Sequence, residues 1–258
     1  MTRLSTRLNP TPPQRHPMRM PLGLGRRAAG CLMLLLGAGA ALGQTLCSSD
    51  GQAPPVALVE RFISAECVSC WQKPLAGQRS AQTMALDWIV PSHRGDDAPL
   101  SAVANNEARL RLAALAQPTP EGQSQIVHPV IGWPGASLRV ARGLALGGYV
   151  GASITLRIPS DVTPNLPLHA WLALVEALPL GTEGSPVPRN LVRNVLQPIW
   201  NGHSVLQESA SWVWQDMRPM NVPVGTQTTR MQMIGWVTDA TGRVLLAAAS
   251  VCPPEHDE

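Results

Sequence analysis

Short apolar segments separated by proline and glycine follow one another along most of the chain. Val56–Ile63 is mostly apolar and predicts a buried strand, and Thr83–Val90 predicts a second strand. Gln72–Gln82 can form a helix between them, and Leu100–Ala116 has the clearest helical spacing of apolar residues. Ile126–Trp133 predicts a third strand. This alternation of strands and helices favours a βαβ-type α/β unit in the first half of the chain.

The pattern changes after residue 151. Ile154, Leu156 and Ile158 alternate with other residues in Ala152–Pro159, as in a half-buried strand. Further short apolar segments cover Leu168–Ala177, Arg189–Leu196, Glu208–Asp216, Thr226–Asp239 and Arg243–Val251. Strands at such regular spacing predict an antiparallel β-sandwich. We therefore expect an α/β domain over residues 44–140 and a β-sandwich domain over residues 141–258.

The first 43 residues have the composition of a signal peptide. Six arginines and no acidic residue precede the uncharged apolar run Ala28–Leu42, and Ala41-Leu42-Gly43 offers small residues for cleavage. A membrane span needs about 20 apolar residues, so this run is short for an anchor. Cleavage changes the net charge from +3 to −3 and removes the basic character that could indicate nucleic-acid binding. We expect a periplasmic or secreted protein whose mature chain has no membrane span.

Four cysteines remain after residue 43, namely Cys47, Cys67, Cys70 and Cys252. Four cysteines in an exported chain predict two disulfides, for which three pairings exist. Cys67 and Cys70 form a CxxC and are the natural local pair, which leaves Cys47 to Cys252. A thiolate at Cys67 is favoured by the start of a helix but disfavoured by the adjacent Glu66. Two interpretations of the CxxC stay open: a redox-active pair and a structural disulfide.

The segment Ala57–Cys70, an apolar strand that runs into the CxxC, resembles the opening of DUF1223, a family of secreted, thioredoxin-like bacterial proteins of unknown function. His128–Gly132 is similar to a later segment of that family. Trp71 departs from the family pattern, which has proline there. The resemblance extends over most of residues 55–250 through the blocks Leu174–Glu176, Gly181–Gly184 and Asn190–Arg193.

The resemblance implies that residues 44–140 form a thioredoxin-like domain. It further implies thiol–disulfide exchange with protein thiols or disulfides through Cys67 and Cys70, without a cofactor or metal. Thioredoxin-like folds place a cis-proline opposite the CxxC, so we expect Pro129 to be cis and to lie beside the sulfurs, with His128 as a polar neighbour. Among the isolated acids on predicted strands, Asp87 is the candidate for a buried proton relay.

Two functions of other classes stay open. The first is a non-enzymatic binding module in which the CxxC is a structural disulfide and Trp212 and Trp214 present a ligand surface. Because two indoles on one strand face usually belong to a core, we expect packing for them instead. The second is copper handling by His128 with the two sulfurs of the CxxC, although a surface His-Pro turn is the commoner role for such a histidine.

Overall fold

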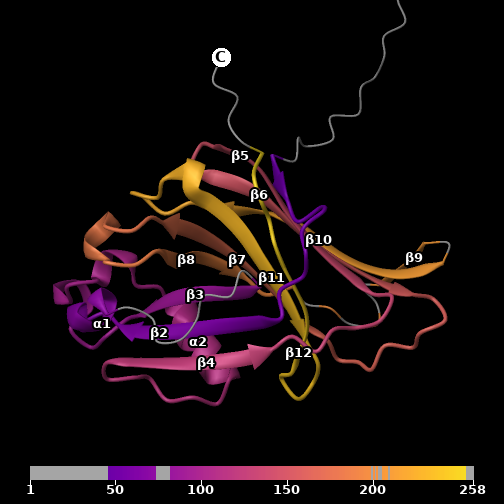
Figure 1. The fold of residues 1–258 in the computed structure, drawn as a ribbon, viewed down its shortest axis with the longest axis horizontal. Coiled ribbons are helices and arrows are strands. Elements are labelled where there is room, and N and C mark those ends of the chain that lie inside the picture. Colours follow the sequence, from indigo (N-terminus) through magenta and orange to yellow (C-terminus); the bar gives the residue numbers. More distant parts are fainter. Residues whose placement is uncertain are drawn as a thin grey trace, which may run out of the picture. The chain divides into compact units, whose positions relative to one another are not determined.

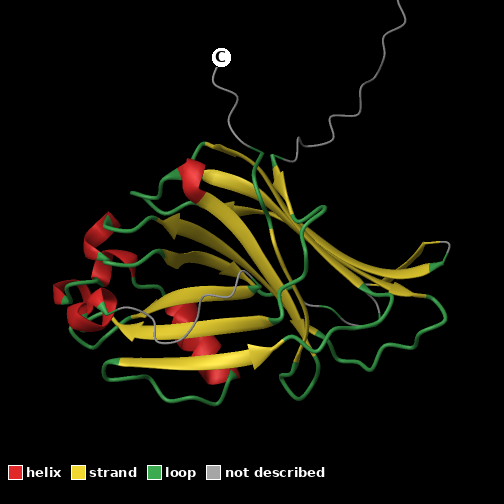
Figure 2. Ribbon diagram, in the orientation of Figure 1, coloured by secondary structure: helices red, strands yellow, loops and turns green. Residues whose placement is uncertain are grey.

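The computed structural model describes residues 46–73, 82–198, 200, 202, 205–208 and 210–253, which form two β-sheets with few helices (Figures 1 and 2). The predicted signal peptide over residues 1–43 and most of the predicted helix Gln72–Gln82 lie outside these residues. In the described part of the chain, no helix is long and apolar enough to cross a membrane.

The larger sheet has seven strands and joins segments from both halves of the chain. Its order is β12 (Val244–Ala249), β11 (Met231–Thr238), β7 (His169–Leu178), β8 (Arg189–Leu196), β3 (Thr83–Val90), β2 (Ala57–Ser64) and β4 (Gln123–Pro129). β2 pairs in parallel with β3, and β3 touches β8 in parallel through Asp87 and Leu191. The remaining pairs are antiparallel, and β4 is the last strand at its edge.

β2 and β3 are buried along nearly their whole length, as their mostly apolar sequences predict. The connection between them includes the short helix α1 (Val68–Gln72), and α2 (Asn106–Ala114) follows β3. Asn105 caps α2 by accepting a hydrogen bond from the Ala108 N–H, which explains why this helix begins six residues later than the apolar spacing predicts. Leu112 of α2 packs with Phe62 and Trp88 on one face of the sheet.

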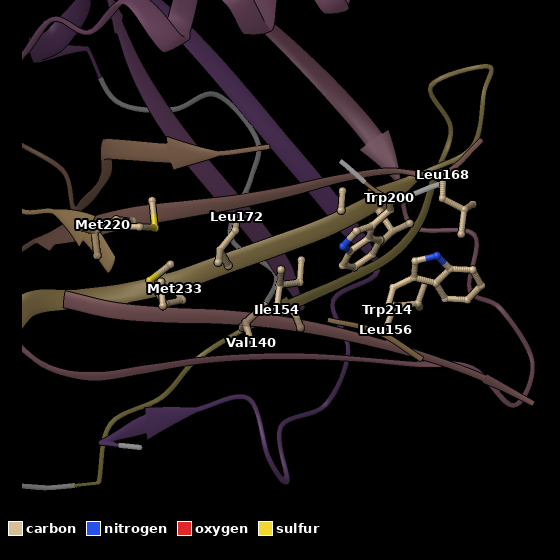
Figure 3. Packing of buried hydrophobic residues seen from close by; sticks show 14 of the residues in the cluster. Val140, Ile154, Leu156, Leu168, Leu172, Trp200, Trp214, Met220 and Met233 are labelled. Atoms are coloured by element: carbon tan, nitrogen blue, oxygen red, sulfur yellow. The ribbon is translucent and has the colours of Figure 1, made fainter. Parts of the chain in front are cut away.

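The smaller sheet has five strands in the order β1 (Cys47–Ser48), β5 (Ser137–Leu146), β6 (Tyr149–Pro159), β10 (Ser211–Asn221) and β9 (Val205–Glu208). Residues from its inner face pack against β7 and β11, so the main apolar core lies between the two sheets (Figure 3). Val140, Ile154 and Trp214 from the smaller sheet meet Leu172 and Met233 from the larger one. Short 3₁₀ turns complete the described elements: η1 (Gly95–Asp97), η2 (Ser101–Val103), η3 (Thr182–Gly184) and η4 (Thr228–Arg230).

The two sheets divide the chain differently from the two predicted domains. The boundary expected between residues 140 and 141 falls inside β5, and strands from both sides of it form the seven-stranded sheet. The sandwich is present, but one of its layers includes β2, β3 and β4 from the predicted α/β unit. This arrangement follows from β3 and β8, which are about 100 residues apart in sequence and yet lie side by side.

Candidate functional site

Cys67 and Cys70 form a disulfide just beyond the end of β2, with an S–S distance of 2.03 Å. The chain turns there because the Cys67 N–H donates to the Ser64 carbonyl and the Ala65 N–H donates to the Val90 carbonyl of β3. Cys67 is partly exposed, whereas Cys70 is only 5% exposed and packs with Trp71 and Ile89. Cys67 is therefore the more exposed residue of this pair and the one that an incoming group can approach.

Two polar groups and one glycine surround the sulfurs. The Cys70 N–H donates to Cys67 Sγ at 3.3 Å, and Ser69 Oγ lies 3.5 Å from the same sulfur. Gly122, immediately before β4, approaches so closely that a Cβ built there would lie 3.4 Å from Cys70 Sγ and 3.9 Å from Cys67 Sγ. Sequence reasoning missed Gly122, since a glycine in a polar loop carries no signal of what it faces.

The helix that contains Cys70 is held by residues far away in sequence. The Trp71 indole Nε1 donates to the Glu183 carbonyl at 2.9 Å. Arg189 lies over the Trp71 ring, and its guanidinium donates to the Trp71 carbonyl and, at 2.8 Å, to the Lys73 carbonyl. A five-residue helix has little stability by itself, so these contacts set its position. They also give Trp71, the departure from the family pattern, a defined role.

Asp87 is buried between two arginines. Its Oδ1 lies 2.5 Å from Arg61 Nη2 and 3.6 Å from Arg189 Nη1, and its Oδ2 accepts from the Asn190 N–H at 3.0 Å. Burial raises the pKa of Asp87, and the charges of Arg61 and Arg189 oppose that rise. Asp87 reaches the CxxC helix through Arg189, a group that stays protonated. Its contacts are those of a positioning residue, and the proton relay expected for it stays a prediction.

The structure corrects the expectation for Pro129. The cis peptide bond in the described residues is Leu166–Pro167, so the bond before Pro129 is trans. Pro129 pairs with Ala57, at the end of β2 opposite the CxxC. The expectation failed because β4 runs antiparallel to β2 and begins at Gln123, so Gly122 lies at the CxxC end of β2 and Pro129 lies at the opposite end. Pro129 is tolerated where it lies because β4 is an edge strand.

His128 is likewise directed away from the CxxC. Its Nε2 lies 3.0 Å from Glu60 Oε2 inside the protein, and Arg111 donates to both oxygens of that carboxylate. Arg111 in turn lies over the Trp171 ring, 4.6 Å from its centroid. The copper set of His128 with the two sulfurs is therefore not assembled. The described residues contain no group of three His, Cys, Asp or Glu side chains placed to hold a metal ion.

The other pair of cysteines forms the disulfide predicted for it. Cys47 and Cys252 are joined at 2.02 Å across 205 positions of sequence. Cys47 is buried in β1, and Ser48 forms a bridge with Val251, so the disulfide fastens the beginning and the end of the described chain to each other. The prediction of two disulfides, one local and one between these distant residues, is confirmed.

The two tryptophans of β10 belong to the core. Trp214 is 1% exposed, and Trp212 packs from the side against the cluster between the sheets. This placement confirms packing and gives no support to a ligand surface formed by these two indoles. Glu176, a third isolated acid on a predicted strand, is buried and paired with Arg193 at 2.5 Å.

Comparisons with known proteins place the fold but not the function. No family model and no curated protein sequence matches the chain. The structure is similar to that of HBP35 of Porphyromonas gingivalis, with a TM-score of 0.50 and 12% sequence identity over 81% of this chain and 80% of that one. At this identity the likeness concerns the fold alone.

Proposed function

We propose that the protein exchanges disulfides with thiols of other polypeptides through Cys67 and Cys70. The observation that carries the proposal is the unequal exposure of the two cysteines, with Cys67 partly exposed and Cys70 buried. Such a pair separates two roles. One sulfur can meet a substrate, while the other leaves when a substrate is oxidised and resolves the mixed disulfide when the dithiol form reduces a substrate.

The chemistry needs no group beyond the disulfide and a substrate dithiol. A substrate thiolate attacks Cys67 Sγ, the Cys67–Cys70 bond breaks, and Cys70 leaves as a thiolate. A second substrate thiolate then attacks the substrate sulfur of the mixed disulfide and releases Cys67 as a thiolate. The substrate is oxidised by two electrons, and the protein is reduced to a dithiol. The Cys70 N–H, which already donates to Cys67 Sγ, is placed to stabilise the Cys67 thiolate.

The order of elements around the pair supports a thioredoxin-like unit. The chain runs β2, α1, β3, α2, β4, and the three strands lie in the order β3, β2, β4 with β4 antiparallel. The disulfide follows the first strand at the start of a helix, as the resemblance to DUF1223 implies. Gly122 takes the place beside the sulfurs where that resemblance implies a proline. Membership of the family stays part of this proposal.

Export is the other part of the proposal. Both disulfides persist in oxidising compartments, and residues 1–43 have the sequence of a signal peptide. A chain exported in this way would meet other secreted polypeptides while their cysteines are being paired.

The test is the reduction potential of Cys67–Cys70 together with the reduction of insulin by the dithiol form. We expect a potential above about −300 mV and turnover of insulin, while a lower potential without turnover would identify a structural disulfide. A Cys70→Ser variant should accumulate mixed disulfides at Cys67. A Cys47→Ser, Cys252→Ser variant is the matched control and should retain the exchange activity.

A further inference from the structure

Arg142 of β5 differs from the other buried arginines of the described chain. The buried arginines are Arg61, Arg111, Arg142, Arg189 and Arg193. Four of them are paired with a buried carboxylate, from Glu60, Asp87 or Glu176. Among the described residues Arg142, 3% exposed, has only neutral acceptors.

Those acceptors are main-chain carbonyls and one sulfur. The Arg142 Nε donates to the Met231 carbonyl at 2.9 Å, and Nη1 donates to the Gly143 carbonyl at 3.1 Å. Nη2 is shared between the Thr228 carbonyl at 3.4 Å and Cys252 Sγ at 3.2 Å. A guanidinium has five N–H donors, so one on Nη1 is left for another acceptor. Burial also lowers the pKa of Arg142, as expected for a cation without a counter-ion.

Arg142 is one of the residues that line a cavity of about 430 Å³. This volume is within the range of small-molecule sites. Leu46, Leu144, Ala145 and Pro253 give the cavity an apolar lining, and Thr228 and Thr229 add hydroxyl groups. Leu144 is half exposed at 51%, so apolar surface continues from the cavity to solvent. The irregular pairing of β5 between Arg142 and Ala145 is a feature that redirects side chains and often accompanies binding sites.

We propose that this cavity binds an organic carboxylate with an apolar chain, with the carboxylate on Arg142 and the chain against Leu46 and Leu144. A buried cation is costly without an opposite charge, and a bound carboxylate supplies that charge at the free Nη1 donor. The apolar lining favours a hydrocarbon chain over a small inorganic anion. The site lies beside the Cys47–Cys252 disulfide and is independent of the exchange chemistry proposed for Cys67.

Decanoate is a suitable probe, with decanol as the uncharged analogue, titrated into the full chain by calorimetry. We expect saturable binding of decanoate that is stronger than that of decanol. Arg142→Gln should weaken decanoate binding roughly tenfold or more, because it removes a charge-assisted hydrogen bond, and should leave decanol unchanged. Arg139→Gln is the matched control, since Arg139 is on the same strand but is paired with Asp50 at 2.7 Å.

Leu144→Glu provides a second variant if Arg142→Gln does not fold. It places a negative charge at the exposed rim and should weaken decanoate more than decanol. Absence of saturable binding to the folded wild-type chain, or equal binding by a folded Arg142→Gln variant, would overturn the proposal.

A second titration tests whether acidic residues of the chain itself occupy the cavity. Glu255, Asp257 and Glu258 follow Pro253 in the sequence. The titration is repeated with these three changed to Gln, Asn and Gln. Unchanged affinity supports an external carboxylate as the occupant. Binding that appears only in this variant would mean that the chain itself fills the site, and would overturn the proposal.

Discussion

Arg189 lies over the ring of Trp71, with its guanidinium carbon 4.9 Å from the ring centroid. The same guanidinium donates to the carbonyls of Trp71 and Lys73 at the end of α1 and faces Asp87 of β3. One side chain of β8 therefore connects the helix that contains Cys70 to the centre of the larger sheet. The position of the Cys67–Cys70 pair depends on a strand that follows it by more than a hundred residues.

Replacing Arg189 should destabilise the protein strongly. Arg189→Gln removes the contacts with α1 and leaves Asp87 buried with one arginine instead of two. Breaking such a buried pair typically costs about 3–5 kcal/mol. Because Arg61 still offsets part of the buried charge of Asp87, we expect the free energy of unfolding in urea denaturation to fall by about 2–4 kcal/mol. Arg157→Gln is the control, because Arg157 and its partner Glu208 are half exposed and should contribute less than about 1 kcal/mol. Equal effects of the two variants would contradict the role assigned to Arg189.

Gly122 should control access to the disulfide. A Cβ at this position would lie 3.4 Å from Cys70 Sγ, which is ordinary contact, but the larger side chain of Gly122→Val has to extend over the sulfurs. We expect slower exchange with a peptide disulfide, while Gly122→Ala should have a smaller effect. Gly151→Val in β6 is the matched control, since a Cβ there meets nothing within 4 Å. The measurement is the exchange rate at equal folded fraction, and an unchanged rate in Gly122→Val would show that substrates approach from elsewhere.

Local patterns along the chain predict where the strands lie better than they predict which strands pair. β3 and β8 have the bounds that their apolar runs predict, and both disulfides follow from the count and spacing of cysteines. The contact between β3 and β8 has no local signal, because it depends on which faces of distant strands complement each other. For this reason the sequence predicts two domains packed against each other, and not a sheet that strands of both halves share.

In the candidate site, too, the sequence predicts the residues of a local motif but not their neighbours in the fold. Cys67 and Cys70 follow from their motif, but the residue opposite them depends on where β4 begins. Because β4 begins at Gln123, Gly122 lies beside the sulfurs, and Pro129 lies at the other end of the strand. The buried pairs that hold the site, such as Arg189 with Asp87, could not be inferred either, because isolated charged residues on predicted strands do not reveal their partners.

Removal of the Cys47–Cys252 disulfide should cost more stability than removal of the CxxC disulfide. In the chain-entropy model, cross-linking residues 205 positions apart stabilises the folded state by about 5 kcal/mol, and a bridge across three positions by about 2 kcal/mol. We therefore expect Cys47→Ser, Cys252→Ser to lower the free energy of unfolding more than Cys67→Ser, Cys70→Ser. Urea denaturation without reductant measures both. The reverse order would mean that the local bridge has a structural role that its loop length does not explain.

Glu60 should make stability depend on pH in the acid range. Burial acts to raise the pKa of Glu60, but the charge of Arg111 and the hydrogen bond from His128 together hold it below its ordinary value of 4.5. A lowered folded pKa means that ionised Glu60 stabilises the folded state fully above the unfolded pKa. That contribution decreases as the pH falls below about 4.5 toward the folded pKa, and is lost below it.

The Glu60→Gln variant isolates this contribution. It also leaves Arg111 buried without its carboxylate, so we expect a loss of about 3 kcal/mol near neutral pH, within the range for a broken buried pair. The difference from wild type in urea denaturation should shrink at about pH 3, because below about 4.5 the unfolded chain binds a proton at Glu60 more readily than the folded chain does. Glu208→Gln removes a half-exposed carboxylate and should show little difference at either pH. If Glu60→Gln is destabilised equally at both values, the ionised carboxylate is not the source of the stability, and Glu60 acts through its packing alone.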